Sequence, residues 1–194
     1  KISPIKLDKF SKQNNIDRNK FIILLPGRLT YWKGQKIFIE AIKLLYEKSD
    51  IPSFEAIVLG NEQGRNVYKK QLIDLVLKHR LNKVIKFIDH CKEMPVAYGI
   101  SNLVCSCSLE PEAFGRIAVE AQSMQIPIIA SDIGGSKETI IKDKTGYLYK
   151  NKDPIDLANS IATVMQKKYD SLQSLGIEGR KNVLKRFDVD KMCQ

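Results

Sequence analysis

The chain has 194 residues, of which 43% are hydrophobic and 28% charged, as is typical of a single globular domain. No apolar run approaches the roughly 18 residues of a membrane-spanning helix, and residues 1–19 lack the apolar segment of a signal peptide. The net charge is +10, but its lysines are scattered and are not interleaved with aromatic residues, so we expect no nucleic-acid partner.

The basic charge has two remaining interpretations. It is either a compositional bias toward lysine or an attraction for an anion, which would be a phosphate-bearing ligand or an anionic membrane. The four cysteines form no C-x-x-C pair, and Cys105 and Cys107 fall on one face of an apolar, strand-like run, so we expect buried thiols and no metal site. A reducing, cytoplasmic location follows, at the inner face of the membrane if the charge serves peripheral attachment.

Apolar runs and helical spacings alternate along the chain after residues 1–19. The apolar runs predict strands at residues 21–25, 54–59, 84–88, 103–107, 126–130 and 145–149. The helical spacings predict helices at residues 35–47, 67–81, 94–100, 114–125, 136–141, 154–168 and 172–187. Ser136 is the expected N-cap of its helix.

This alternation predicts an α/β fold with a doubly wound, mostly parallel, Rossmann-like sheet over residues 20–194. Ligands of such sheets bind beyond the carboxyl ends of the strands. Residues that directly follow a predicted strand are therefore the first candidates for a functional site.

The loop after the first strand, residues 27–34, carries Arg28 and Lys33. Gly27 permits a sharp turn, and two cations beside a helix start suit a diphosphate. The alternative is a turn with two solvated basic residues.

The segment after the fourth strand carries Glu112 and, eight positions later, Glu120. Amides around Phe114, Gly115 and Arg116 would form an anion site at a helix start. A half-buried carboxylate needs a hydrogen-bond partner, and a ribose diol would supply two hydroxyl donors. The alternative is a charged helix start with Glu120 paired to a lysine.

The segment after the fifth strand contains Gly134, Gly135 and Glu138. A Gly-Gly turn before a helix is a candidate oxyanion or phosphate cradle, although such turns are also common without a ligand. The acidic pair Asp188 and Asp190 has metal-binding spacing but lies far from any strand end, so we interpret it as surface. P-loop, dinucleotide-binding and Gly-x-Ser-x-Gly motifs are absent.

Taken together, these segments resemble the C-terminal, donor-binding domain of the retaining family-4 glycosyltransferases, which have the GT-B fold of two Rossmann-like domains. The resemblance covers almost the whole chain, and residues 1–19 look like the inter-domain linker. The matching motifs are Gly27-Arg28 with Lys33-Gly34, then Glu112, Phe114-Gly115 and Glu120, and finally Gly134-Gly135 with Glu138.

The resemblance implies a nucleotide diphospho-sugar as substrate, with no cofactor or metal. It implies that Arg28 and Lys33 stabilise the departing diphosphate and that Glu120 binds the ribose. Glu112 and the amides of Phe114, Gly115 and Arg116 would hold the sugar, and residues 88–90 would lie near the base. The implied enzyme is a hexosyltransferase of envelope glycan synthesis that transfers the sugar to a lipid or glycan with retention.

The chain departs from the family pattern in two respects. Its second strand ends in Leu59-Gly60-Asn61-Glu62, where the family often has Val-Gly-x-Gly, and we expect that these residues do not include the family's N-terminal acceptor domain. We therefore expect donor binding without turnover from these residues alone. The alternatives are a sugar-nucleotide epimerase of the same fold and a non-catalytic nucleotide-sugar-binding or scaffold domain.

Overall fold

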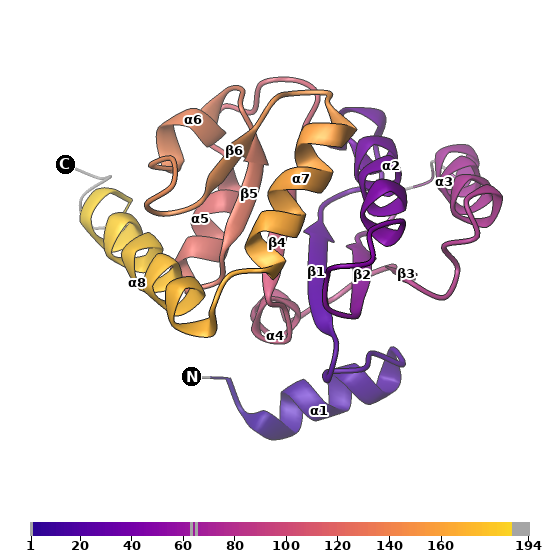
Figure 1. Ribbon diagram of the computed structural model, residues 1–194, viewed down its shortest axis with the longest axis horizontal. Coiled ribbons are helices and arrows are strands. Elements are labelled where there is room, and N and C mark those ends of the chain that lie inside the picture. Colours follow the sequence, from indigo (N-terminus) through magenta and orange to yellow (C-terminus); the bar gives the residue numbers. More distant parts are fainter. Residues whose placement is uncertain (1, 63, 65, 188–194) are drawn as a thin grey trace.

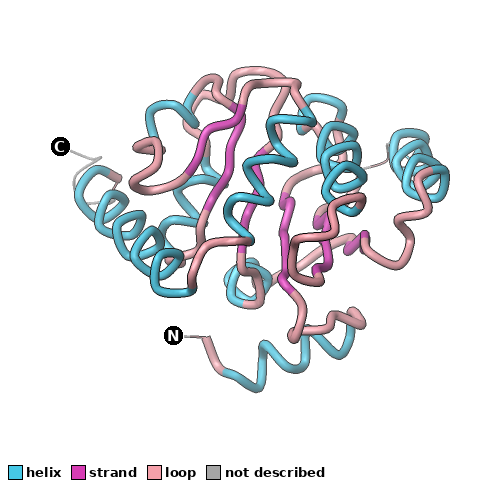
Figure 2. The backbone as a smooth tube through the Cα atoms, in the orientation of Figure 1, coloured by secondary structure: helices cyan, strands magenta, loops and turns pink. Residues whose placement is uncertain are grey.

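The computed structural model describes residues 2–62, 64 and 66–187, and its described residues form one parallel sheet with helices on both faces (Figures 1 and 2). The strands are β1 (Phe21–Pro26), β2 (Phe54–Leu59), β3 (Ile85–Ile88), β4 (Leu103–Ser106), β5 (Ile128–Ser131) and β6 (Tyr147–Tyr149). Their order in the sheet is β3-β2-β1-β4-β5-β6, and every neighbouring pair is parallel. The predicted doubly wound, Rossmann-like fold is confirmed.

Helices cover the sheet from two sides because alternate strand residues point to opposite faces. On β1, Ile23 and Leu25 pack with α2 (Gln35–Tyr46), α3 (Asn66–Lys78) and α7 (Pro154–Met165). On the same strand, Ile22 and Leu24 pack with α4 (Met94–Gly99) and α5 (Arg116–Ser123). Both sides of β1 are thus apolar, as its continuous apolar run indicated.

The remaining helices lie at the borders of these layers. They are α1 (Pro4–Gln13), the single-turn helix η1 (Tyr31–Lys33), α6 (Gly135–Thr139) and α8 (Tyr169–Arg186). Helix α8 packs on α5, and α1 packs on α4 (Figure 1). The contact between α1 and α4 is close, because a Cβ on Gly99 would lie 3.0 Å from Cδ2 of Leu7 on α1. No element had been predicted for α1, which was expected to be part of a linker.

Two details of the sequence prediction are wrong. Helix α5 begins at Arg116, two residues later than predicted, with Gly115 as its N-cap in a left-handed conformation (φ 71°); Glu112 precedes the helix, as expected. Helix α6 has Gly134 as its N-cap, and Ser136 lies inside the helix. Each helix follows a glycine with a positive φ, because the chain turns tightly just before the helix begins.

The buried thiols were predicted correctly. Cys105 and Cys107 are buried in the same core cluster, and burial raises the pKa of Cys107 to about 12. Asp188, Asp190 and Cys193 lie outside the described residues.

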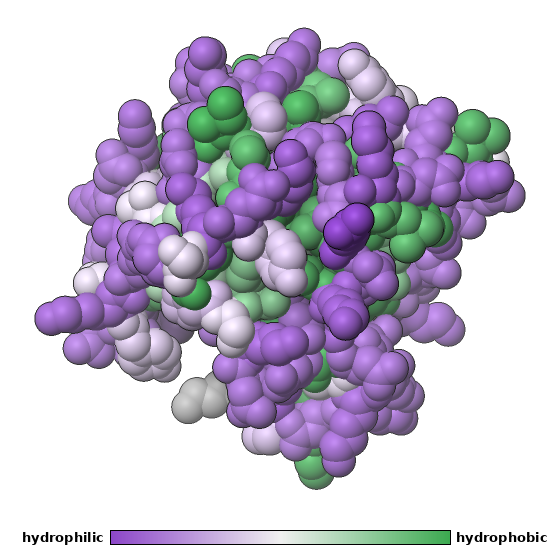
Figure 3. Space-filling model, turned by 45° about the vertical axis from the view of Figure 1, so that its right-hand side comes forward, coloured by the Kyte–Doolittle hydropathy of each residue, from purple (hydrophilic) through white to green (hydrophobic). Residues whose placement is uncertain are grey.

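The surface is hydrophilic over most of the face in Figure 3, with apolar side chains in small, separate groups. Within the described part of the chain, no helix combines the length and the hydropathy that a bilayer crossing requires.

Candidate functional site

A cavity of about 640 Å³ opens at the carboxyl ends of β1 and β4. Strands β1 and β4 are neighbours in the middle of the sheet, and the chain order reverses between them, which is the usual ligand position in doubly wound folds. The cavity is lined by the ends of β1 and β2, by the loops after β1, β2, β3 and β4, and by parts of three helices: Pro26, Gly27, Arg28, Lys33, Leu59, Gly60, Asn61, His90, Cys91, Met94, Tyr98, Glu112, Ala113, Phe114, Gly115, Arg116, Ile117 and Glu120. Eight of these had been predicted as site residues: Gly27, Arg28, Lys33, Glu112, Phe114, Gly115, Arg116 and Glu120.

The loop after β1 carries the two cations and is fixed by its neighbours. The buried side chain of Gln35 donates a hydrogen bond from Nε2 to the Arg28 carbonyl oxygen (2.8 Å), and the Leu29 amide donates to the Asn61 oxygen (2.9 Å). These bonds hold the backbone between β1 and α2. The Arg28 and Lys33 side chains are thereby presented on one side of the cavity.

Glu112 lies against Lys33 in the cavity wall. Lys33 Nζ donates a 2.7 Å hydrogen bond to Glu112 Oε1, and Ser108 Oγ donates to the same oxygen. Burial by itself raises the pKa of Glu112, but hydrogen bonds from Lys33 and Ser108 and the charges of Lys33 and Arg116 outweigh it, so the pKa is lowered. Glu112 is therefore an anion at neutral pH and sits beside the cation that would face a phosphate.

Glu120 also lines the cavity and comes from α5. Its Oε2 atom accepts a 2.6 Å hydrogen bond from the hydroxyl of Tyr98, whose side chain comes from α4. Its Oε1 atom lies 3.5 Å from Arg116 Nε. The Glu120 side chain is 40% exposed, so its carboxylate is open to a ligand.

Gly134 and Gly135 lie behind the loop that carries Glu112 and do not line the cavity. The Gly135 amide donates a 2.7 Å hydrogen bond to the Glu112 carbonyl oxygen. A Cβ on Gly134 would lie 2.7 Å from the Glu112 nitrogen, and one on Gly135 would overlap Phe114. The two glycines support the loop by close approach. Glu138 is exposed on α6, and the expected donor-binding role of these three residues stays a prediction.

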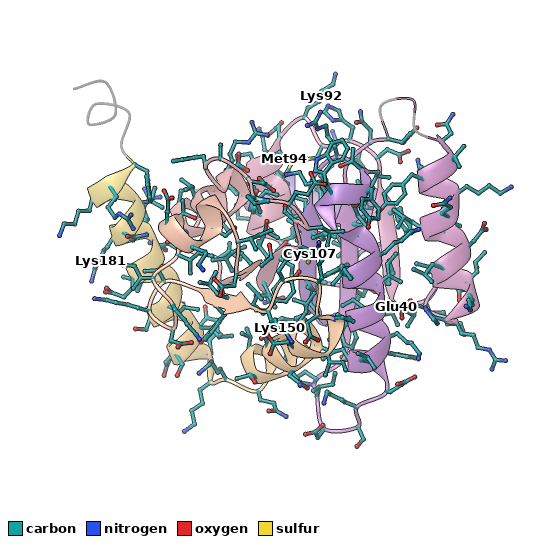
Figure 4. All side chains as sticks on the ribbon, turned by 90° about the horizontal axis from the view of Figure 1, so that it is seen from above. Glu40, Lys92, Met94, Cys107, Lys150 and Lys181 are labelled. Atoms are coloured by element: carbon teal, nitrogen blue, oxygen red, sulfur yellow. The ribbon has the colours of Figure 1, made fainter. Side chains whose placement is uncertain are left out.

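The opposite end of the cavity had been predicted only in outline. Asn61, His90, Cys91 and Met94 come from the loops after β2 and β3 and from the start of α4. In Figure 4, which looks onto the carboxyl-end edge, Met94 lies on the side of the sheet covered by α4 and α5. Tyr98 and Ser108 were missed, although Ser108 follows a predicted strand and could have been found by that position.

The arrangement combines opposite charges in one cavity. Arg28 and Lys33 are suited to a diphosphate, and the glycine N-cap of α5 has no side chain to bond the amides of the first turn. Two carboxylates at separate positions can each accept hydrogen bonds from hydroxyl groups. A ligand that carries both a diphosphate and a polyhydroxyl group fits this pattern.

Comparison with known proteins agrees with this geometry. The family model for glycosyl transferases group 1 matches residues 7–182. The capsular polysaccharide biosynthesis glycosyltransferase CapM of Staphylococcus aureus is 25% identical over 192 residues, which cover 94% of this chain and 48% of CapM. A glycosyltransferase structure from Rickettsia africae superposes with a TM-score of 0.93 at 29% identity and covers 98% of this chain and 50% of that one.

The Anabaena protein HepE, solved in complex with UDP-glucose, superposes with a TM-score of 0.88 at 28% identity and covers 98% of this chain and 51% of that one. The chain spans about half the length of these structures and between about a third and a half of the curated relatives it matches. The similarity therefore concerns one half of longer proteins.

Proposed function

Because the chain belongs to the glycosyl transferases group 1, we propose that it is the donor-binding half of an enzyme that transfers a sugar from a nucleotide diphospho-sugar to an acceptor. The observation that carries this proposal is the cavity at the carboxyl ends of β1 and β4, with Arg28 and Lys33 on one side and Glu120 on another. Arg28 and Lys33 are suited to bind a diphosphate, and Glu120 is suited to bind a ribose. The binding of UDP-glucose by HepE supports the same ligand class.

In the proposed reaction, Arg28 and Lys33 bind the diphosphate and stabilise its charge as it leaves. Such electrostatic stabilisation is worth about 3–4 kcal/mol per well-placed group. These two cations do the work of a metal ion in this scheme, so neither a metal nor another cofactor is required. EDTA should then leave nucleotide binding unchanged.

Glu112 is proposed to hold the sugar and Glu120 the ribose. The ion pair between Lys33 and Glu112 links the diphosphate position to the sugar position, since its two side chains meet at 2.7 Å. The amides of Phe114, Gly115 and Arg116 lie in the wall between the two carboxylates and suit an anion at the start of α5. Residues 60–61 and 90–91 are proposed to face the base.

The acceptor and the outcome of the transfer follow from the family resemblance. We propose a hexosyl donor, transfer with retention, and a lipid or glycan acceptor of the cell envelope, a class supported by the similarity to CapM. The acceptor half is proposed to lie outside these 194 residues, so that the chain alone binds donor without turnover. A cytoplasmic location follows from the use of nucleotide sugars, and the +10 charge supports peripheral attachment to an anionic inner membrane face.

The test is calorimetric titration of the 194-residue chain with UDP, GDP and ADP. We expect one of the three to bind with a stoichiometry of one, and the corresponding nucleotide sugar to compete for the same site. The proposal would be overturned if none of the three bound at millimolar concentration. Product analysis on a protein that also contains the other half would then separate glycosyl transfer from epimerisation of the nucleotide sugar.

A further inference from the structure

Tyr98 is a buried residue in the cavity wall that the proposed reaction has not used. The residue is 2% exposed and packs in the core between α4 and the sheet, and its hydroxyl bonds to Glu120, which lines the cavity with it. That hydroxyl donates to Glu120 Oε2 at 2.6 Å, the distance of a short, charge-assisted hydrogen bond. The buried ring cannot move away without disturbing the core, so the hydroxyl is a fixed point.

The second partner of Glu120 is of a different kind. Arg116 lies one turn earlier on α5, its side chain is 84% exposed, and its Nε atom is 3.5 Å from Glu120 Oε1. An exposed pair at this spacing is weak and competes with water. If Arg116 were the only partner, the partly exposed Glu120 side chain would be free to change rotamer toward solvent.

We propose that Tyr98 is a positioning residue that holds the Glu120 carboxylate in the orientation that binds a ribose diol, and so makes the site selective for ribonucleotides. This inference rests on the proposed function, in which Glu120 binds the ribose. Tyr98 does not touch the ribose itself, and it acts by fixing one carboxylate oxygen.

The hydrogen-bonding capacity of the carboxylate permits both contacts. A carboxylate offers about four lone-pair positions, of which Tyr98 occupies one on Oε2. The remaining positions on the two oxygens can accept the 2′- and 3′-hydroxyls. Burial, followed by the hydrogen bond and the charge of Glu120, raises the pKa of Tyr98 far above its usual range, so the phenol stays protonated and can only donate to Glu120.

The test compares two ligands that differ only in the diol. The probes are the nucleoside diphosphate among UDP, GDP and ADP that the wild-type chain binds most tightly, and its 2′,3′-dideoxy form. We expect Tyr98→Phe to weaken binding of the ribonucleotide roughly tenfold, because a carboxylate of Glu120 that is no longer held in place loses the equivalent of one charge-assisted contact with the diol, and to leave the affinity for the dideoxy form unchanged. Equal weakening of both ligands, or of neither, would overturn the inference.

Two further variants make the result specific. Tyr149→Phe removes another buried phenolic hydroxyl, on β6 and away from the cavity, and should leave the ratio of the two affinities at its wild-type value. Glu120→Gln should lose the preference for the ribonucleotide, and adding Tyr98→Phe to it should change the ratio no further. A retained preference in Glu120→Gln would overturn the inference even if Tyr98→Phe failed to fold.

The proposed function and this inference fail in different ways. If the wild-type chain binds no nucleoside diphosphate, the proposed function is wrong and the inference falls with it. If the wild-type chain binds and the ratio is insensitive to Tyr98→Phe, only the inference is wrong.

Discussion

Two acidic residues of this chain, Glu55 and Glu112, are each paired with lysine, but at opposite ends of the sheet. Glu55 lies on β2 with a side chain that is 4% exposed, and it is bonded to Lys86 (2.8 Å), to Lys20 (3.3 Å) and to the Asp17 amide. Glu112 lies beyond the carboxyl end of β4 with a side chain that is 25% exposed, and its partners are Lys33 and Ser108. The first pair is enclosed, and the second forms the wall of a cavity.

The difference teaches how a structural ion pair is distinguished from a candidate site. Around Glu55, the two lysines and the Asp17 amide bond to both carboxylate oxygens, and the side chain is almost fully buried. Around Glu112, the hydrogen bonds from Lys33 and Ser108 both reach Oε1, which leaves Oε2 without a hydrogen bond from the described residues, and Lys33 and Glu112 both line the cavity. Charge alone does not separate the two cases, but exposure and the distribution of partners do.

The largest effect is expected when the two cations that line the cavity, Arg28 and Lys33, are removed. Arg28→Ala combined with Lys33→Ala should lower nucleoside diphosphate affinity by at least about 100-fold, because each charge-assisted contact contributes on the order of 1.5–3 kcal/mol. Calorimetry measures the change. A matched control, Arg18→Ala with Lys43→Ala, removes the same charge at exposed sites away from the cavity and should change the affinity less than about twofold. A similar loss in both variants would mean that only net charge attracts the ligand.

The next effect concerns stability and should appear only at the enclosed pair. Glu55→Ala leaves two lysines without their buried partner, and we expect a loss of about 2 kcal/mol in the free energy of unfolding, with nucleotide affinity unchanged. Glu112→Ala should cost less than about 1 kcal/mol, since Lys33 can turn to water in the cavity. Urea denaturation compares the two. A larger cost for Glu112→Ala would show that the open pair is the structural one.

The smallest expected effect is a pH dependence of folding stability that comes from Glu112. The pKa of Glu112 is lowered in the folded chain, so its contribution to stability is fully present above its unfolded pKa, near 4.3, and is lost as the pH falls through the lower, folded value. Thermal unfolding between pH 7 and pH 3 should show a steeper acid loss for wild type than for Glu112→Gln. Parallel curves below pH 4.5 would contradict this assignment of the charge.

Much of the fold follows from local patterns. The run at residues 21–25 is apolar at every position and the run at 54–59 at every position except Glu55, as is typical of strands in a sheet covered on both faces, and β1 and β2 coincide with these runs within one residue. Helix α1 could not be predicted in the same way. Leu7 and Phe10 provide its contact with the core, and its position depends on Gly99, which is distant in sequence.

The candidate site was predictable where topology alone determines it. Parallel strands bring the loops after β1 and β4 to one edge, so Arg28, Lys33 and Glu112 had to be near one another. The pairing of Tyr98 with Glu120 was not predictable, because it depends on how two helices pack in three dimensions. Likewise, a Gly-Gly turn has the same sequence whether it faces a ligand or the back of another loop.

The close packing of Gly134 and Gly135 has a thermodynamic consequence for binding. The backbone of Glu112 and Phe114 packs directly against these glycines, and the Gly135 amide donates a hydrogen bond to the Glu112 carbonyl oxygen. The loop that carries Glu112 is therefore ordered before a ligand binds. Little conformational entropy then has to be lost on association, which favours affinity from few contacts. In Gly135→Ala, the added methyl group would displace the loop that carries Glu112. Ligand binding should then be weaker because its entropy is less favourable, although every charged side chain is still present.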